Sequence, residues 1–176
     1  MKTIQTFGKL FIAASIILLS SCSSDDNNNT PVTPIPVQAN SSFVQGKIDG
    51  ASFSSFIFGT SAASCSRSGT GADAIITILG ADMTANSITV HLHGIAAVGS
   101  YTVNSSTDSL LNYSPGSGDF AYATGACDGA SGTINVTVVD ATHIEGTFSF
   151  VGKDAENCSA TKTITEGTFK GVFPSS

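Results

Sequence analysis

The sequence predicts an all-β fold: an antiparallel β-sandwich or barrel-like sheet of about eight or nine strands, with minimal helix beyond the first residues. Three observations predict it. Short segments that alternate apolar and polar side chains recur at intervals of roughly ten residues. Turn residues such as Asp49-Gly50 separate these segments. No segment after residue 21 repeats apolar side chains at the 3.6-residue period of an amphipathic helix.

The first strands are expected between residues 43 and 79. Phe43–Ile48 ends at Asp49-Gly50, a strong hairpin signal, and Phe53–Phe58 follows. Residues 59–71, rich in Ser, Gly and Ala, are expected to form a loop. Ile75–Leu79 is apolar at nearly every position, which predicts a strand buried on both faces.

The middle of the chain is expected to contain fewer strands. Residues 87–93 alternate cleanly, with apolar side chains at even positions and Thr or His at odd positions. Gly99–Val103 predicts a short strand, and Phe120–Ala123 another. Residues 104–118 hold Asn, Ser, Pro and Gly, so they are expected to form a long loop.

Three strands are expected in the last third. Thr133–Val139 should turn Val138 and its even-numbered apolar neighbours inward, and His143–Val151 should do the same with its own. In Thr163–Phe173 the apolar positions change from even to odd around Gly167, which predicts a bulge there. The nine Phe residues after position 22 lie in or beside these segments and are expected to pack in the core.

Three cysteines lie within the expected domain: Cys65, Cys127 and Cys158. Antiparallel pairing of 133–139 with 143–151 brings the flanking segments, and so Cys127 and Cys158, to the same end. A disulfide between them is therefore expected, provided the Cα atoms lie within about 7 Å. Cys65 is then left as a free thiol, expected to be buried and inert.

The start of the chain has the organisation of an export signal. Residues 1–21 combine Lys2 and Lys9 with an apolar run from Leu10 to Leu19, which is too short to span a bilayer core that needs about 20 residues. Residues 22–41 are polar and proline-rich, so a disordered tether is expected. Residues 42–176 form the expected β-sandwich domain.

Charge excludes some partners. Without Lys2 and Lys9, five basic residues remain against 13 acidic residues, a formal charge of −8. This balance argues against nucleic acid and against an anionic membrane bound through a basic patch.

Few residues have the character of a binding or catalytic site. His91 and His93 share one face of a strand, and His143 with Glu145 forms a second outward pair, so together they are a candidate metal site. Ordinary solvated strand faces account for the same pattern. No Gly-x-Ser-x-Gly or His-Glu-x-x-His motif is present, so we expect neither enzyme activity nor a cofactor.

A second candidate is a contact surface in the expected 104–118 loop. Tyr113, with Leu110 and Leu111, could contact a glycan or protein partner if exposed. The alternative is that these side chains tuck under the sheet as a small satellite core.

The stretch Leu19-Ser20-Ser21-Cys22 resembles the lipobox of bacterial lipoproteins. The resemblance implies that the Cys22 thiol is acylated and that the mature chain contacts a membrane through this lipid.

The order of features also resembles a domain-of-unknown-function family of small Bacteroidota lipoproteins. The shared features are the lipobox, an acidic-polar tether, a central Val98–Val103 segment, and the closing Gly146–Phe150 and Thr165–Phe169 segments. The resemblance implies an outer-membrane lipoprotein without a nameable activity.

In such bacteria, Ser23-Ser24-Asp25-Asp26 resembles a surface-export signal, which implies display on the cell surface; a periplasm-facing anchor is the alternative. Asp108-Ser109-Leu110 resembles a short O-glycosylation sequon of the same bacteria, with Ser109 as acceptor.

The leading interpretation is a lipid-anchored envelope domain that acts as a binding or structural module, with a protein or glycan partner at the cell surface. The alternative is a small ligand-binding module for a glycan or a metal ion. The sequence does not indicate the oligomeric state.

Overall fold

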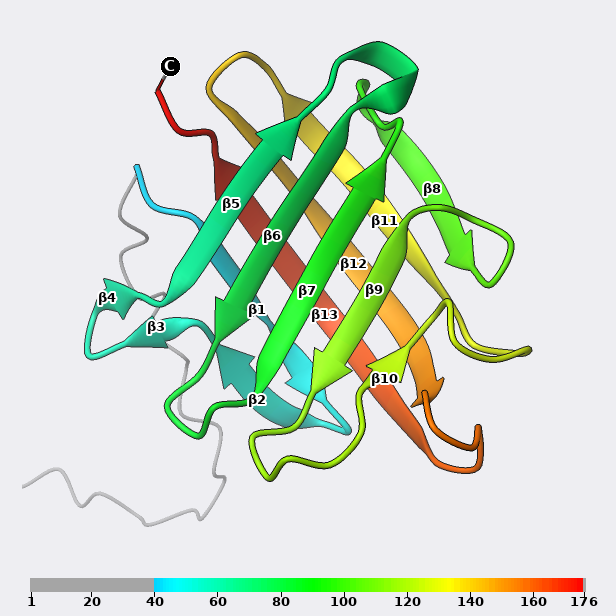
Figure 1. Ribbon diagram of the computed structural model, residues 1–176. Helices are drawn as coiled ribbons and strands as arrows, with labels where there is room; N and C mark the ends of the chain where they lie inside the picture. Colours follow the sequence, from blue (N-terminus) through cyan, green and yellow to red (C-terminus); the bar gives the residue numbers. More distant parts are fainter. Residues whose placement is uncertain (1–39, 176) are drawn as a thin grey trace, which may run out of the picture. The chain divides into compact units, whose positions relative to one another are not determined.

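The computed structural model describes residues 40–175, which form an all-β fold (Figure 1). Cys22, the export signal and most of the tether lie outside the described residues. The described part contains one turn of 3₁₀ helix, Gly71–Asp73, and no helix long and apolar enough to cross a membrane. The strands are β1 (Phe43–Ile48), β2 (Ala51–Ser54), β3 (Phe56–Ile57), β4 (Thr60–Ser61), β5 (Ala63–Ser68), β6 (Ile75–Ala81), β7 (Ser87–His93), β8 (Gly99–Asn104), β9 (Leu110–Ser114), β10 (Tyr122–Ala123), β11 (Ser131–Val139), β12 (His143–Asp154) and β13 (Thr161–Val172).

The main sheet is antiparallel and curls into a half-barrel. Nine strands follow one path, in the order β2-β1-β13-β12-β10-β9-β7-β6-β5. Strand β13 occupies one edge of the long strand β12, while β11 and then β10 share the other edge. Beyond β11 lies β8, and β3 pairs with β4 in a separate two-stranded hairpin.

The curl produces two layers that pack against each other. In Figure 1, β5, β6, β7 and β9 run across the front, and β1, β13, β12, β11 and β8 cross behind them. The short strand β10 joins the layers because it pairs with β9 on one side and β12 on the other. We call these the front layer and the back layer.

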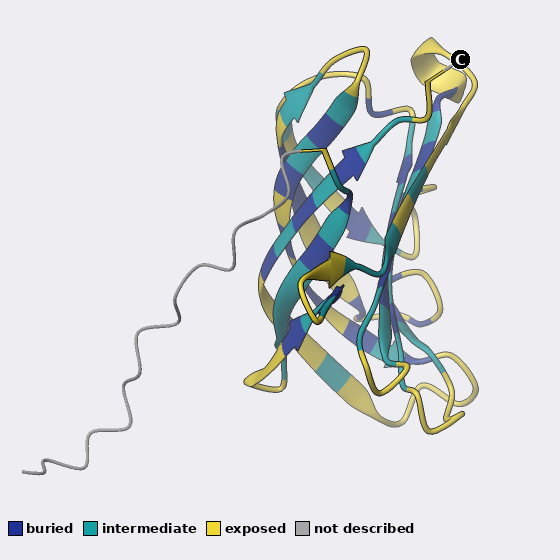
Figure 2. Cartoon of the chain, turned by 90° about the vertical axis from the view of Figure 1, so that its left-hand side faces the viewer, coloured by how far each residue is buried: buried dark blue, intermediate teal, exposed yellow. Residues whose placement is uncertain are grey.

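The core lies between the layers. Ile76, Val90, Ile134, Ile164 and Phe169 come from both layers and have at most 2% of their surface exposed. Figure 2 shows the bands of buried and exposed residues that alternate along the strands. This is the period-2 pattern expected where one face of each strand contributes to the core.

Two glycines allow the layers to approach closely. A Cβ atom at Gly80 of β6 would lie 2.7 Å from the Cβ of Val44 in β1. One at Gly171 of β13 would lie 2.6 Å from the Sγ of Cys65 in β5. Any larger side chain at either position would push a strand out of its layer.

Most of the predicted strands are confirmed. The segments 43–48, 87–93, 99–103, 133–139 and 143–151 lie in β1, β7, β8, β11 and β12. Asp49 and Gly50 form the tight turn between β1 and β2, with φ values of 48° and 86°. Such a turn matches the twist of the strands that it joins.

Two expected loops contain strands instead. Within 59–71, Ala63–Ser68 is β5, an edge strand that pairs with β6. Within 104–118, Leu110–Ser114 is β9, which pairs with β7 and β10. The strand β5 consists of small and polar residues, and β9 is flanked by Ser, Asn, Pro and Gly, so pairing with neighbouring strands determines both more than intrinsic propensity does.

The expected inward faces are wrong at two strands. The strand β6 is buried on one face only, and Leu79 on its other face is 40% exposed. In β11 a register shift between Val136 and Val138 moves Val139, rather than Val138, to the core side. Beyond a bulge the inward and outward positions of a strand are exchanged. No glycine in this segment of the sequence indicates the bulge.

The bulge in β13 is confirmed. Its pairing with β12 jumps from Phe148↔Gly167 to Phe150↔Ile164, so Thr165 and Glu166 face one partner residue. Glu166 has a φ of 51°. Because of the extra residue, the buried positions change from even-numbered, at Ile164, to odd-numbered, at Phe169. This is the change that the sequence predicted.

The expectation that all nine phenylalanines pack is wrong for two of them. Phe58 is 92% exposed at the tip of the β3–β4 hairpin, and Phe120 is 55% exposed between β9 and β10. Gly59 follows Phe58 in a two-residue turn, so turn geometry rather than burial sets this position.

Candidate functional site

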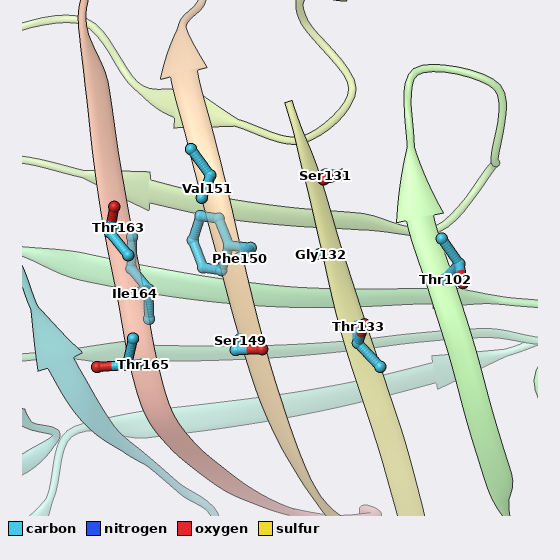
Figure 3. A pocket seen from close by; sticks show the side chains of 10 residues that line it. All are labelled: Thr102, Ser131, Gly132, Thr133, Ser149, Phe150, Val151, Thr163, Ile164 and Thr165. Atoms are coloured by element: carbon cyan, nitrogen blue, oxygen red, sulfur yellow. The ribbon is translucent and has the colours of Figure 1, made fainter. Parts of the chain in front are cut away.

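The outer face of the back layer is lined with small hydroxyl side chains. Thr102 of β8, Thr133 of β11, Ser149 of β12, and Thr163 and Thr165 of β13 are all exposed (Figure 3). Alternation along each strand places an apolar residue inward for every hydroxyl residue outward. We call these five residues the threonine-rich face.

The threonine-rich face holds two shallow cavities. One, of about 370 Å³, is lined by all five residues and by Val151. The other, of about 380 Å³, shares Thr133 and Ser149 with it and extends to Asn135 and Thr168. Volumes in this range are typical of small-ligand sites, which are usually more enclosed.

The two cavities combine apolar surface with hydroxyl and amide groups that can form hydrogen bonds. Glu166 contributes the one ionisable side chain of their lining, and its Oε1 lies 2.8 Å from the Nζ of Lys47. Hydroxyl groups donate and accept hydrogen bonds without titrating near neutral pH. Such a lining suits a polar neutral ligand better than proton transfer.

The predicted disulfide is confirmed. Cys127 and Cys158 are bonded, with their Cα atoms 5.8 Å apart. They lie just outside the β11–β12 hairpin, which pairs Ser131 with Val151. The bond therefore closes the end of this hairpin, as the antiparallel pairing required.

The free thiol, Cys65, is half-buried on the core side of β5. Burial raises its pKa to about 11, because the apolar surroundings disfavour the thiolate. Cys65 is therefore a poor nucleophile at neutral pH.

The candidate metal residues lie on different layers. His91 and His93 are on β7 in the front layer, while His143 and Glu145 begin β12 in the back layer. Among residues 40–175, no cluster of three or more His, Cys, Asp or Glu side chains is arranged to hold a metal ion.

Each histidine has protein partners. His91 Nδ1 lies 3.0 Å from the Thr77 hydroxyl, and His93 Nδ1 lies 3.7 Å from the carboxylate of Asp108. His143 lies between two carboxylates, 3.2 Å from Asp140 and 3.4 Å from Glu145. The structure thus brings His143 and Glu145 together, but not with the β7 pair.

Tyr113 and Leu111 face the core. Tyr113 is 7% exposed, and its hydroxyl donates a hydrogen bond to Asn86 Oδ1; Leu111 is fully buried. Leu110, half-buried, is on the opposite face of β9 and pairs with His91. The satellite-core alternative is the closer description, but Leu111 and Tyr113 belong to the main core and Leu110 does not.

Ser109, the expected glycosylation acceptor, is 8% exposed. Its hydroxyl accepts a hydrogen bond from the backbone N–H of His93 at 3.0 Å. The oxygen that a glycan would occupy is enclosed in this arrangement.

Three aspartates hold tight turns through hydrogen bonds to their carboxylates. Bonds from the Thr142 hydroxyl and backbone lower the pKa of Asp140 to about 2. An ion pair with Lys162 lowers the pKa of Asp49. At Asp82 burial would raise the pKa, but bonds from Asn86 and Thr84 outweigh it. These carboxylates stabilise turns rather than line a cavity.

A further cavity lies beside Arg67, and the sequence did not predict it. The Arg67 guanidinium carbon lies 4.8 Å from the centre of the Phe173 ring. Both residues line a space of about 430 Å³ between the β5–β6 loop, the β11–β12 turn and the segment after β13. The one signal was that Arg67 is the only arginine of the chain.

Fold and surface together define a small all-β domain of two packed layers, stapled by one disulfide. A family model described as a domain of unknown function, DUF6252, matches residues 40–173. The chain belongs to this family. No curated protein and no solved structure matches the chain.

Proposed function

We propose that this protein is a lipid-anchored envelope domain that acts by binding, without catalysing a reaction. The lipid is attached at Cys22, residues 23–41 are the tether, and the domain from residue 42 is displayed at the outer membrane, most simply at the cell surface. The Cys127–Cys158 disulfide supports an oxidising compartment outside the cytoplasm.

The threonine-rich face is the observation that carries the binding role. Two cavities lie side by side on one exposed sheet face, and Glu166, their one ionisable side chain, is paired with Lys47. General acid–base catalysis needs a titratable group free to exchange a proton with the substrate. A hydroxyl-lined surface of this kind supports recognition instead.

Lipid attachment is tested by growing the native host with an alkyne-bearing fatty acid and following the label into the protein. The wild-type chain should carry the label and sediment with membranes. A Cys22→Ala variant should carry none, while Cys65→Ala should remain labelled. Equal labelling of both variants, or none of the wild type, would contradict the anchor.

Glycans are the favoured ligand class, because the Ser and Thr hydroxyl groups of this face can both donate to and accept from hydroxyl-rich sugars. In glycan-array binding, Thr133→Lys and Ser149→Lys should abolish retention by covering the cavities. The matched control is Thr89→Lys on the outer face of the front layer, which should retain it. Retention unaffected by all three variants would remove the threonine-rich face from the proposal.

A further inference from the structure

We infer that the cavity beside Arg67 binds a sugar that carries a single carboxylate, such as a hexuronic or sialic acid unit. The inference rests on the proposed binding function and adds a second, chemically distinct subsite to it. Three observations support it: the position of Arg67, the absence of an acidic partner for Arg67 within residues 40–175, and the hydroxyl-bearing and apolar residues that line the cavity.

Arg67 is on the core side of its strand. It pairs with Ile76 of β6, and directly opposed residues of antiparallel strands share one face. Ile76 is 2% exposed, so Arg67 continues the inward row of β5, but Arg67 itself is exposed where that row ends. Its guanidinium carbon there lies 4.8 Å from the centre of the ring of Phe173, which follows β13.

Arg67 differs from the other cations of the described chain. Lys47, Lys162 and Lys170 each form an ion pair with a carboxylate at 2.7–2.8 Å. Lys153 donates a hydrogen bond to the Asp128 carbonyl. Arg67 contacts an aromatic ring and has no carboxylate paired to it within residues 40–175. Lys162 also lies over a ring, with its Nζ 6.0 Å from the centre of Tyr122, but its charge is paired with Asp49.

This arrangement suits a carboxylate. The Arg67 guanidinium carbon lies over the Phe173 ring, and within residues 40–175 no carboxylate is paired with its N–H groups. Arginine pairs with a carboxylate through two parallel hydrogen bonds. A lysine would supply charge without this fork.

The rest of the wall suits a sugar ring. Ser68, Thr70 and Ser175 supply hydroxyl groups, and Pro174 supplies apolar contact. Asp73 and Asp140 belong to the flanking loops but do not line the cavity, and the Asp140 carboxylate accepts bonds from Thr142 and His143. A ligand with one negative charge avoids the repulsion that this acidic chain imposes on a polyanion.

The test uses the full-length chain in detergent micelles and two probes, methyl glucuronide and the methyl glycoside of N-acetylneuraminic acid. Methyl glucoside, which has a hydroxymethyl group in place of the carboxylate, is the matched ligand control. NMR titration follows the Arg67 side-chain N–H and the backbone N–H groups of Gly69 and Thr70. Saturable shifts at these signals are expected with at least one acidic probe and not with methyl glucoside.

Variants separate the cavity from general charge. Arg67→Gln should weaken binding by about ten- to a hundredfold, the effect of one lost charged hydrogen-bond pair. Arg67→Lys should weaken it less, and Lys153→Gln should bind like the wild type. Unfolding midpoints within the wild-type range establish that each variant is folded.

Three results would overturn the inference: no saturable shift with either acidic probe, equal binding of methyl glucoside, or equal loss in Lys153→Gln. An inward charge on an edge strand also deters pairing with another chain. If that is its only role, Arg67→Gln would self-associate while the acidic sugars fail to bind. Lipid labelling at Cys22 does not depend on Arg67, so this failure is distinguishable from failure of the anchor.

Discussion

At the scale of single residues, Phe58 occupies a position that stability alone does not favour. It has a φ of 50° and is 92% exposed at the tip of the β3–β4 hairpin. A non-glycine residue in the left-handed region costs roughly 1–2 kcal/mol, and asparagine tolerates it best. Because the ring is exposed, no burial of apolar surface compensates for this cost.

Replacing this ring should therefore stabilise the domain. We expect Phe58→Asn to raise the free energy of unfolding by about 0.5–1 kcal/mol, because asparagine followed by glycine suits this turn. Urea denaturation measures the change. Gly59→Ala in the same turn, where φ is 81°, should lower the stability. A loss of stability in Phe58→Asn would mean that the ring packs on something in solution.

Cys65 provides a second prediction at this scale. With its pKa raised to about 11 by burial, only about one thiol in several thousand is ionised at pH 7.5. Iodoacetamide should therefore modify native Cys65 on the order of a hundredfold more slowly than the same thiol in urea. Mass spectrometry at timed intervals measures the rates. Equal rates would show that Cys65 is an accessible, activated thiol.

At the scale of elements, the β11–β12 hairpin depends on a turn carboxylate. Asp140 accepts bonds from Thr142 and from the His143 backbone, which hold its pKa near 2 against an ordinary value of 3.8. A carboxyl with a lowered pKa stabilises the fold above its unfolded pKa. This contribution is lost as the pH falls through the folded value.

The wild-type domain should therefore lose unfolding free energy as the pH drops from about 4 to about 2. Asp140→Asn should begin less stable at pH 6 and lose less over the same interval. Urea midpoints measured at pH 6, 4, 3 and 2 test this. Asp128→Asn, in an exposed loop, is the control and should follow the wild type, because the contact of Asp128 with Lys153 is made by its backbone carbonyl. Parallel curves for all three proteins would contradict the account.

The disulfide stabilises the same hairpin from its other end. Cys127 and Cys158 are 31 residues apart, and closing a loop of that length contributes about 3–4 kcal/mol by chain entropy. The Cys127→Ala/Cys158→Ala double variant should lose about that much in urea denaturation. The Cys65→Ala variant, which keeps the disulfide, should lose less; similar losses would contradict a specific role for the disulfide.

The sequence predicted elements where side chains alternate strongly, and missed elements fixed by their neighbours. The strand β7 shows its inward row as Ile88, Val90 and Leu92, so its pattern alone sufficed. The strand β5, by contrast, has only Ala63, Cys65 and Arg67 on its inward side. Its pairing with β6 determines it, and no local pattern reports such pairing.

The candidate site was less predictable than the fold. The disulfide followed from the topology of one hairpin, because its flanking segments must meet. The threonine-rich face and the Arg67–Phe173 contact combine residues from strands that are distant in the sequence. Residue 67 and residue 173 become neighbours only when β5 closes toward β13, which alternation within one strand does not reveal.

At the scale of the whole molecule, the central claim is that a lipid on Cys22 and a polar tether display this DUF6252 domain outside the cell. The most direct measurement is protease shaving of intact cells of the native host, followed by mass spectrometry of the released material. The account predicts cleavage within residues 23–41 and release of an intact 42–176 domain from unbroken cells. Protection of the domain until the outer membrane is opened would contradict surface display and place the anchor facing the periplasm.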